Sequence, residues 1–164
     1  KKEFDAIWNW AKTHMYHTRA DHPARGYFAW SVKSSGEPID EMPAPDGEEY
    51  FVTALYFAAA RWGNGEGIYD YRAEADRVLT DALHREPITG RTNRGEMTAV
   101  NLFDTKAKMV RFTPDVTHAG HTDASYHVPA FYEVWSRVGP RADRARSRLR
   151  RPGRGDGRSR RMTL

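Results

Sequence analysis

The spacing of apolar residues predicts four helices. In each stretch the apolar side chains recur every three or four positions, as they do along one face of an amphipathic helix. Helix breakers follow each stretch, namely His22-Pro23, the run GNGEG, Pro87 and Gly139-Pro140. The predicted helices cover about residues 3–16, 47–62, 71–86 and 129–138.

Two other stretches are typical of extended chain. GYFAWSV, at 26–32, is rich in aromatic and β-branched residues and is followed by the turn signal SSGEP. AVNLFDTKAKMVRFTP, at 99–114, predicts a short hairpin that turns near Asp104-Thr105. The fold class predicted from these patterns is therefore mainly α, with a short extended or hairpin segment.

A weak internal repeat suggests how the helices are arranged. DGEEYFVTALYFAAARWG, at 46–63, and DASYHVPAFYEVWSRVG, at 123–139, each run from an aspartate through an aromatic helix to a glycine. Repeated helical hairpins of this kind are typical of an α-toroid or a solenoid.

Charge divides the chain at about residue 140. Residues 141–164 hold ten of the 26 Lys and Arg and two of the 22 Asp and Glu, whereas residues 1–140 carry a net charge of −4. The Arg-rich segment lacks aromatic residues and apolar periodicity, so we expect one domain at 1–140 and a disordered tail at 141–164. Such a tail can bind nucleic acid through its phosphates. The abrupt change of composition instead favours a tail derived from a shifted reading frame.

Several classes of chemistry find no support in the sequence. The chain has no cysteine, which excludes disulfides and thiolate zinc sites. It has no phosphate-binding loop, no dinucleotide fingerprint and no nucleophile elbow, so no cofactor is predicted. No run resembles a transmembrane segment or a signal peptide, so we predict no membrane partner and a cytoplasmic location.

Asp46 is the first candidate site residue, and two roles stay open for it. It can start the helix at 47–62 by accepting from the backbone N–H of Glu48 or Glu49, with Glu49 reaching back as in a capping box. It can also act on a ligand, if aromatic platforms for sugar rings lie beside it. The candidate platforms are Trp30, Tyr50 and Tyr27.

The loop HAGHTDASYH, at 118–127, is the second candidate. His118, His121 and Asp123 have the spacing of metal ligands, but histidines are common in solvated loops, and we predict no metal site. Tyr126 is of more interest, because a phenol beside the start of a helix can hold a water molecule or a substrate hydroxyl.

Four segments, IWNWAKTHM, GYFAW, PAPDGEEYFVTALYFAAARWG and TDASYHVPAFYEVW, resemble glycoside hydrolase family 8. Within the family they are similar to the reducing-end xylose-releasing exo-oligoxylanases. The resemblance implies an (α/α)6 barrel that hydrolyses β-1,4 bonds of xylo-oligosaccharides with inversion. By matching motifs it implies that Asp46 lies in the active site, that Tyr126 holds the attacking water and that Trp30 lines the sugar-binding cleft.

The resemblance also implies that the catalytic pair is missing. The family's general acid is a Glu in a Glu-Gly-Met-Ser-Tyr-Gly-like segment upstream of IWNW, and its general base is an Asp well downstream of the Ser-Tyr-His motif. Neither segment has a match in this chain. We therefore expect an internal fragment, an incomplete arc of the barrel with four to five of its twelve helices, that is itself inactive.

Three functional hypotheses follow from these observations. The first is a truncated family 8 glycoside hydrolase whose catalytic-site residues are Asp46 and Tyr126 and whose substrate-binding residues are Trp30 and Tyr50. The second is a carbohydrate-binding remnant without catalysis, in which Trp30, Tyr50 and Trp62 stack on sugars. The third is a basic-tailed nucleic-acid-binding protein, against which the acidic domain argues. We predict xylo-oligosaccharide as the partner and no nucleic acid.

Overall fold

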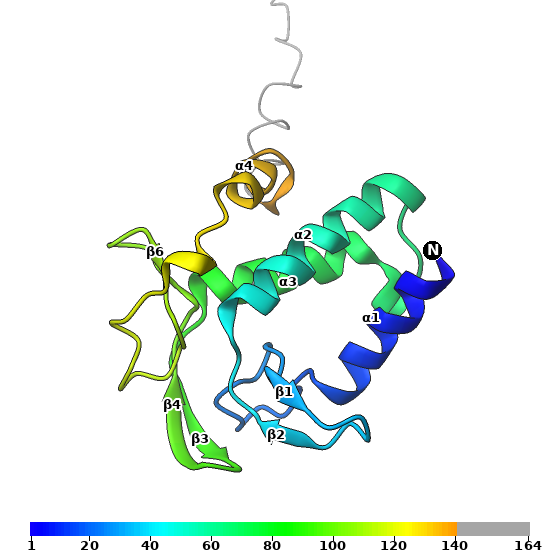
Figure 1. Cartoon of the computed structure of the whole chain (residues 1–164). Helices are drawn as coiled ribbons and strands as arrows, with labels where there is room; N and C mark the ends of the chain where they lie inside the picture. Colours follow the sequence, from blue (N-terminus) through cyan, green and yellow to red (C-terminus); the bar gives the residue numbers. More distant parts are fainter. Residues whose placement is uncertain (141–164) are drawn as a thin grey trace, which may run out of the picture.

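The computed structural model describes residues 1–140 of the 164. The predicted disordered tail at 141–164 lies outside the described residues. Within 1–140 the elements are mainly helical, and the helices stand in the predicted order (Figure 1). They are α1 (Lys2–His14), α2 (Pro45–Trp62), α3 (Tyr71–His84) and α4 (Pro129–Val138), with single 3₁₀ turns at Gly67–Tyr69 and Ala124–Tyr126.

The helix ends follow local signals. Pro45 and Pro129 occupy the first turns of α2 and α4, where a fixed φ angle helps and the missing N–H costs nothing. The Asp70 carboxylate caps α3 by accepting from the backbone N–H of Ala73 at 3.1 Å. All four predicted helices are thus confirmed, and their ends lie within about two residues of the predicted positions.

Three antiparallel hairpins make up the strands of the described residues. The hairpin predicted at 99–114 is confirmed as a two-residue pair, with the Asp104 carboxylate accepting from two N–H groups in its turn. The longest hairpin, which pairs Ile88 with Ala99, was not predicted, because its polar residues lack a clear apolar alternation. The strands are β1 (Ser31–Val32), β2 (Pro38–Asp40), β3 (Ile88–Thr92), β4 (Gly95–Ala99), β5 (Phe103–Asp104) and β6 (Met109–Val110).

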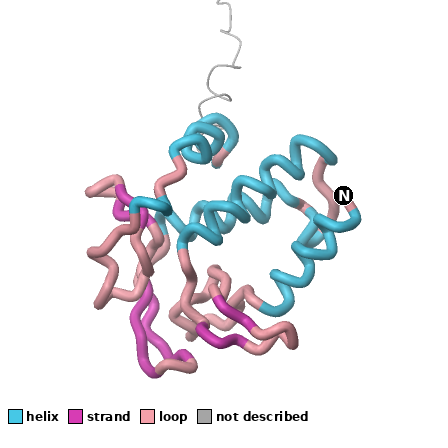
Figure 2. Tube along the Cα trace, in the orientation of Figure 1, coloured by secondary structure: helices cyan, strands magenta, loops and turns pink. Residues whose placement is uncertain are grey.

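Helices α2 and α3 form the centre of the molecule. They lie side by side, and α1 and α4 pack at their flanks, while the strands and long loops lie to the left of them and below in this view (Figure 2). Buried apolar side chains from all four helices form one cluster, which explains why the periodic stripes predicted these helices correctly. Its buried members are Trp8, Ala11, Phe28, Val52, Leu55, Tyr56, Ala58, Tyr71, Ala75, Val78, Leu79 and Trp135.

One end of the predicted α2 stripe is not buried. Leu55 and Ala58 lie in the core, but Trp62 is 39% exposed and rests against Phe4 of α1, with 5.4 Å between the ring centroids. Trp62 is the last residue of α2, so the helix carries it about 24 Å from Asp46 at 1.5 Å per residue.

A second buried cluster joins the hairpins to α3. Tyr27 lies at its centre, fully buried, with its hydroxyl 3.1 Å from the Asp81 carbonyl oxygen and 3.2 Å from that of Val100. The interpretation of Tyr27 as a sugar platform is therefore wrong, because no ligand can reach its ring. Its role is to anchor the segment that leads to Trp30.

No helix within residues 1–140 combines the length and the apolar character needed to cross a membrane.

Candidate functional site

A cleft of about 560 Å³ opens beside the start of α2. It is built from segments far apart in the sequence: the chain after Phe28, the loop before α2, the β3–β4 hairpin and the loop that leads to α4. Aromatic rings, two histidines and two carboxylates meet there, which is the mixture of apolar faces and polar groups typical of ligand sites. The lining residues are Trp30, Asp40, Met42, Pro43, Ala44, Arg94, Met97, Phe112, Thr113, Asp115, His118, His121 and Tyr126.

Trp30 and Tyr126, both singled out from the sequence, share this cleft. The Trp30 backbone N–H donates to the Met42 carbonyl at 3.0 Å, and its side chain is left 57% exposed. Tyr126 closes the 3₁₀ turn at Ala124–Tyr126, and its ring stacks on Phe112 with 5.7 Å between centroids and 15° between planes. The cleft thus offers flat aromatic surfaces from two distant segments.

Asp46 lies near this cleft, but it does not cap α2. The helix begins at Pro45, so Asp46 sits inside the first turn, and its carboxylate accepts from the adjacent Gly47 N–H at 3.0 Å. The predicted cap is wrong because Pro45, not Gly47, starts the helix. Burial raises the pKa of the Tyr126 phenol, and the negative charge of Asp46 raises it further, which links the two candidate residues electrostatically.

Tyr50 is separate from the cleft lining. It lies one turn along α2 from Asp46, is 61% exposed and meets Phe131 of α4 edge-on at 5.0 Å between centroids. Trp62, at the far end of the helix, also lies outside the cleft lining.

Two buried carboxyl groups beside the site were missed from the sequence. The Glu48 Oε1 atom accepts from the Phe28 backbone N–H at 2.8 Å, and the Glu49 Oε1 atom lies 3.1 Å from the Tyr132 hydroxyl oxygen. Glu49 therefore does not close the predicted capping box. Burial raises the pKa of each group to about 8. The signal was present in the sequence, because Glu48 shares the helical spacing of Val52 and Leu55.

These carboxyl groups make stability depend on pH. Each keeps its proton in the folded chain up to about pH 8 but loses it near the ordinary value of 4.5 when the chain unfolds. The free energy of unfolding should therefore fall as pH rises between these values. Half-buried His17, whose pKa is lowered by burial to about 4, has the opposite effect on the free energy of unfolding, but only up to its ordinary value of 6.5.

Of Glu48, Glu49 and His17, only the two carboxyl groups change the free energy of unfolding between pH 6.5 and 8. We expect the free energy of unfolding to drop there by up to about 1.4 kcal/mol per pH unit for each group. Denaturant unfolding at several pH values measures this drop. The double variant Glu48→Gln and Glu49→Gln should give a flatter profile, and a profile of the unmodified chain that is flat or rises would contradict the expectation.

In the loop at 118–127 and just before it, polar side chains form hydrogen bonds with neighbouring groups of the protein. Hydrogen bonds from Thr117 and His118 outweigh burial and lower the pKa of the Asp115 carboxyl, which lies 2.8 Å from the His118 Nδ1 atom. Asp123 instead accepts from the Ser125 N–H at 2.8 Å. Among residues 1–140, no three His, Cys, Asp or Glu residues gather as metal ligands would.

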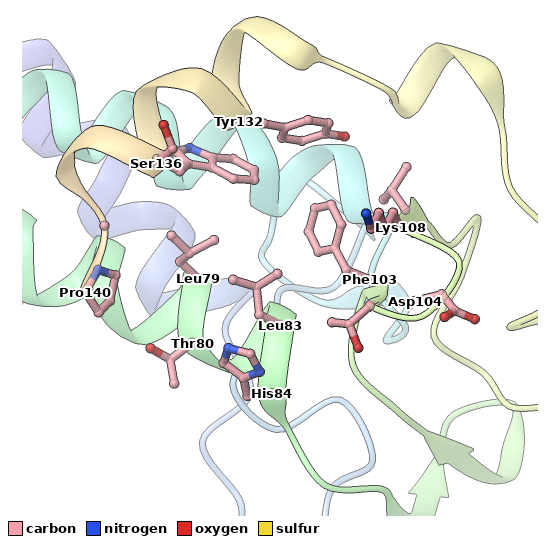
Figure 3. A pocket seen from close by; sticks show the side chains of 14 residues that line it. Leu79, Thr80, Leu83, His84, Phe103, Asp104, Lys108, Tyr132, Ser136 and Pro140 are labelled. Atoms are coloured by element: carbon pink, nitrogen blue, oxygen red, sulfur yellow. The ribbon is translucent and has the colours of Figure 1, made fainter. Parts of the chain in front are cut away.

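A second hollow, of about 440 Å³, lies between α3, α4 and the β5–β6 hairpin. Its walls are mostly apolar, and Figure 3 shows Leu79, Leu83 and Phe103 beneath Tyr132. Its exposed surface is more apolar than that of the first cleft, and it holds neither Trp30 nor Tyr126. We therefore regard the first cleft as the candidate site.

No family model matches the chain. The known proteins that are similar to it are xylanases and exo-oligoxylanases. Among curated proteins, the reducing-end xylose-releasing exo-oligoxylanase of Paenibacillus barcinonensis is 38% identical over 144 residues, which are 88% of this chain and 34% of that protein. Its counterpart in Bifidobacterium adolescentis is 39% identical over 144 residues, again 88% of this chain and 35% of that protein. The chain thus spans about a third of the length of these relatives.

Solved structures agree with the sequence relatives. A catalytic mutant of a family 8 xylanase from Teredinibacter turnerae, in complex with xylohexaose, is 67% identical with a TM-score of 0.85, over 88% of this chain and 37% of that one. The Paenibacillus barcinonensis enzyme complexed with xylose is 38% identical with a TM-score of 0.71, over 87% of this chain and 34% of that one.

These similarities of sequence and fold make the chain a relative of glycoside hydrolases. The solved relative from Teredinibacter turnerae is a family 8 xylanase, and the segment is similar to reducing-end xylose-releasing exo-oligoxylanases, as the motifs predicted.

Proposed function

We propose that residues 1–140 are part of the catalytic domain of a xylan-degrading family 8 glycoside hydrolase. In this proposal the helices form an incomplete arc of an (α/α)6 barrel, and the cleft beside α2 binds xylo-oligosaccharides. The observation that carries the proposal is the shared cleft of Trp30 and Tyr126 in a chain 67% identical to a xylanase studied with xylohexaose.

Each site residue has a role that its position supports. Trp30 offers an exposed aromatic face on which a xylose ring can stack, and Tyr50 extends the aromatic surface along α2. Asp46 supplies negative charge near Tyr126, where an oxocarbenium-like sugar would be stabilised. Tyr126 supplies a phenol that can orient the attacking water.

The complete reaction would be hydrolysis of β-1,4-xylosidic bonds with inversion. Inversion needs a general acid and a general base roughly 6.5–9.5 Å apart, with room for a water molecule between them. The motifs for both groups are missing from this sequence, so we propose that the 164-residue chain binds xylo-oligosaccharide without hydrolysing it. This differs from the carbohydrate-binding remnant of the second hypothesis in that Trp62 is not required.

Binding of xylohexaose to the purified chain tests the proposal. We expect Trp30→Ala to weaken binding at least tenfold, which corresponds to about 1.4 kcal/mol, because the stacking face is lost. Titration calorimetry measures the affinity. Trp10→Ala is the matched control, since Trp10 is also an exposed tryptophan but lies on α1 outside the cleft lining. Equal affinities of Trp30→Ala and the unmodified chain, or no binding to either, would overturn the proposal.

A further inference from the structure

The hydroxyl of Tyr132 stands between two acceptors. Its oxygen lies 3.1 Å from Glu49 Oε1 and 3.4 Å from the carbonyl oxygen of Tyr126. A phenol has one proton, so it can fully satisfy only one of these two acceptors at a time. A second proton, on the Glu49 carboxyl, would satisfy both: the carboxyl donates to Tyr132, and Tyr132 donates to the Tyr126 carbonyl.

The surroundings of Glu49 favour that second proton. Its side chain is 1% exposed, and its other oxygen, Oε2, has no hydrogen-bond partner within the described part of the chain. An ionised carboxylate would leave a charged oxygen buried and unpaired, which costs far more than leaving a neutral carboxyl oxygen there. The hydrogen-bond requirements of the two acceptors and the burial of the side chain therefore both favour the protonated, neutral form of the Glu49 carboxyl group.

We propose that Glu49 is a positioning residue for the cleft: its carboxyl group donates to the Tyr132 hydroxyl, which in turn holds the Tyr126 carbonyl. This relay links α2 to α4 and fixes the 3₁₀ turn that presents the Tyr126 phenol. The inference rests on the proposed function in one respect, namely that Tyr126 contributes to sugar binding.

The relay should open at alkaline pH. When Glu49 loses its proton, the Tyr132 proton turns toward the new carboxylate and releases the Tyr126 carbonyl. Burial and the charge of Asp46 raise the pKa of Glu49 to about 8, while the hydrogen bond that Tyr132 can donate to the ionised carboxylate acts against them. Burial and Glu49 raise the pKa of Tyr132 to about 12, so Tyr132 keeps its own proton through this transition. Phe103 of β5 also packs edge-on against Tyr132, but its ring is apolar and does not titrate.

The Tyr126 carbonyl can be observed directly. In the full chain labelled with carbonyl-¹³C tyrosine, the Tyr126 signal should shift with a midpoint near pH 8. Glu49→Gln should abolish this shift, because the glutamine amide donates to Tyr132 but does not titrate. Glu48→Gln is the matched control and should keep the shift, since Glu48 is an adjacent buried carboxyl that accepts from Phe28. A shift that persists in Glu49→Gln, or a signal from the unmodified chain that does not titrate near pH 8, would overturn the relay.

Sugar affinity then tests the consequence for the cleft. The affinity of the unmodified chain for xylohexaose should fall at least threefold between pH 7 and pH 9, whereas Glu49→Gln should change less than twofold. If the carbonyl titrates but the affinity of the unmodified chain is independent of pH, Glu49 does not position the binding site and the inference is wrong. If xylohexaose does not bind at any pH, the proposed function fails, and the carbonyl titration still decides whether the relay exists.

Discussion

The purified 164-residue chain is expected to release no measurable xylose from xylotriose. General acid and general base catalysis each typically contribute a factor of about 10²–10⁴ in rate, and the function proposed above is that this chain lacks both groups. The residues proposed for the cleft can bind and orient a sugar, but they do not form an acid and base pair. A loss of at least about 10⁴-fold relative to a complete relative is therefore expected.

Product analysis by chromatography measures this loss. The reducing-end xylose-releasing exo-oligoxylanase of Paenibacillus barcinonensis is a suitable positive control, run at the same protein concentration. Xylose release by the 164-residue chain within a hundredfold of that control would show that other residues supply the proton transfers. Binding of xylohexaose in the same preparation separates an inactive site from an unfolded chain.

Among the single substitutions proposed for this chain, loss of the Glu74 carboxylate should lower the free energy of unfolding most. Glu74 is buried and the Lys12 side chain is only 9% exposed, and Lys12 Nζ lies 3.1 Å from Glu74 Oε2, which joins α1 to α3. Arg77 also pairs with Glu74. Burial lowers the pKa of Lys12, against the opposing effect of Glu74. Glu74→Gln leaves the lysine buried without its counter-charge, and breaking a buried pair in this way typically costs about 3–5 kcal/mol.

Denaturant unfolding with matched variants measures this cost. Glu133→Gln removes a carboxylate from an exposed pair with Arg137 on α4 and should cost less than about 1 kcal/mol. The double variant Lys12→Met and Glu74→Leu should recover most of the loss, because two apolar side chains then replace two charges. Equal costs for Glu74→Gln and Glu133→Gln would show that the buried pair does not hold α1 to α3.

The helices were predictable because their signals are local. In α2 and α4 a proline sets the first turn, and in α3 Asp70 caps it; apolar residues at three- and four-residue steps then mark the buried face. The resemblance to family 8 was readable for a related reason, since its motifs are short runs such as PAPDGEEYF that keep their residue order. The β3–β4 hairpin lacked such a signal, because its stability depends on packing against the second core cluster.

The sequence by itself therefore determined the helical order, the resemblance to family 8 and the identity of Asp46, Tyr126, Trp30 and Tyr50 as candidates. Only the tertiary structure decided which of them meet. Trp30 and Tyr126 are 96 positions apart, yet they line one cleft, while Tyr27, three residues before Trp30, is fully buried. The proton relay through Glu49 and Tyr132 is likewise a contact between α2 and α4. Burial and hydrogen bonding between distant segments set these features, and local periodicity carries no information about such contacts.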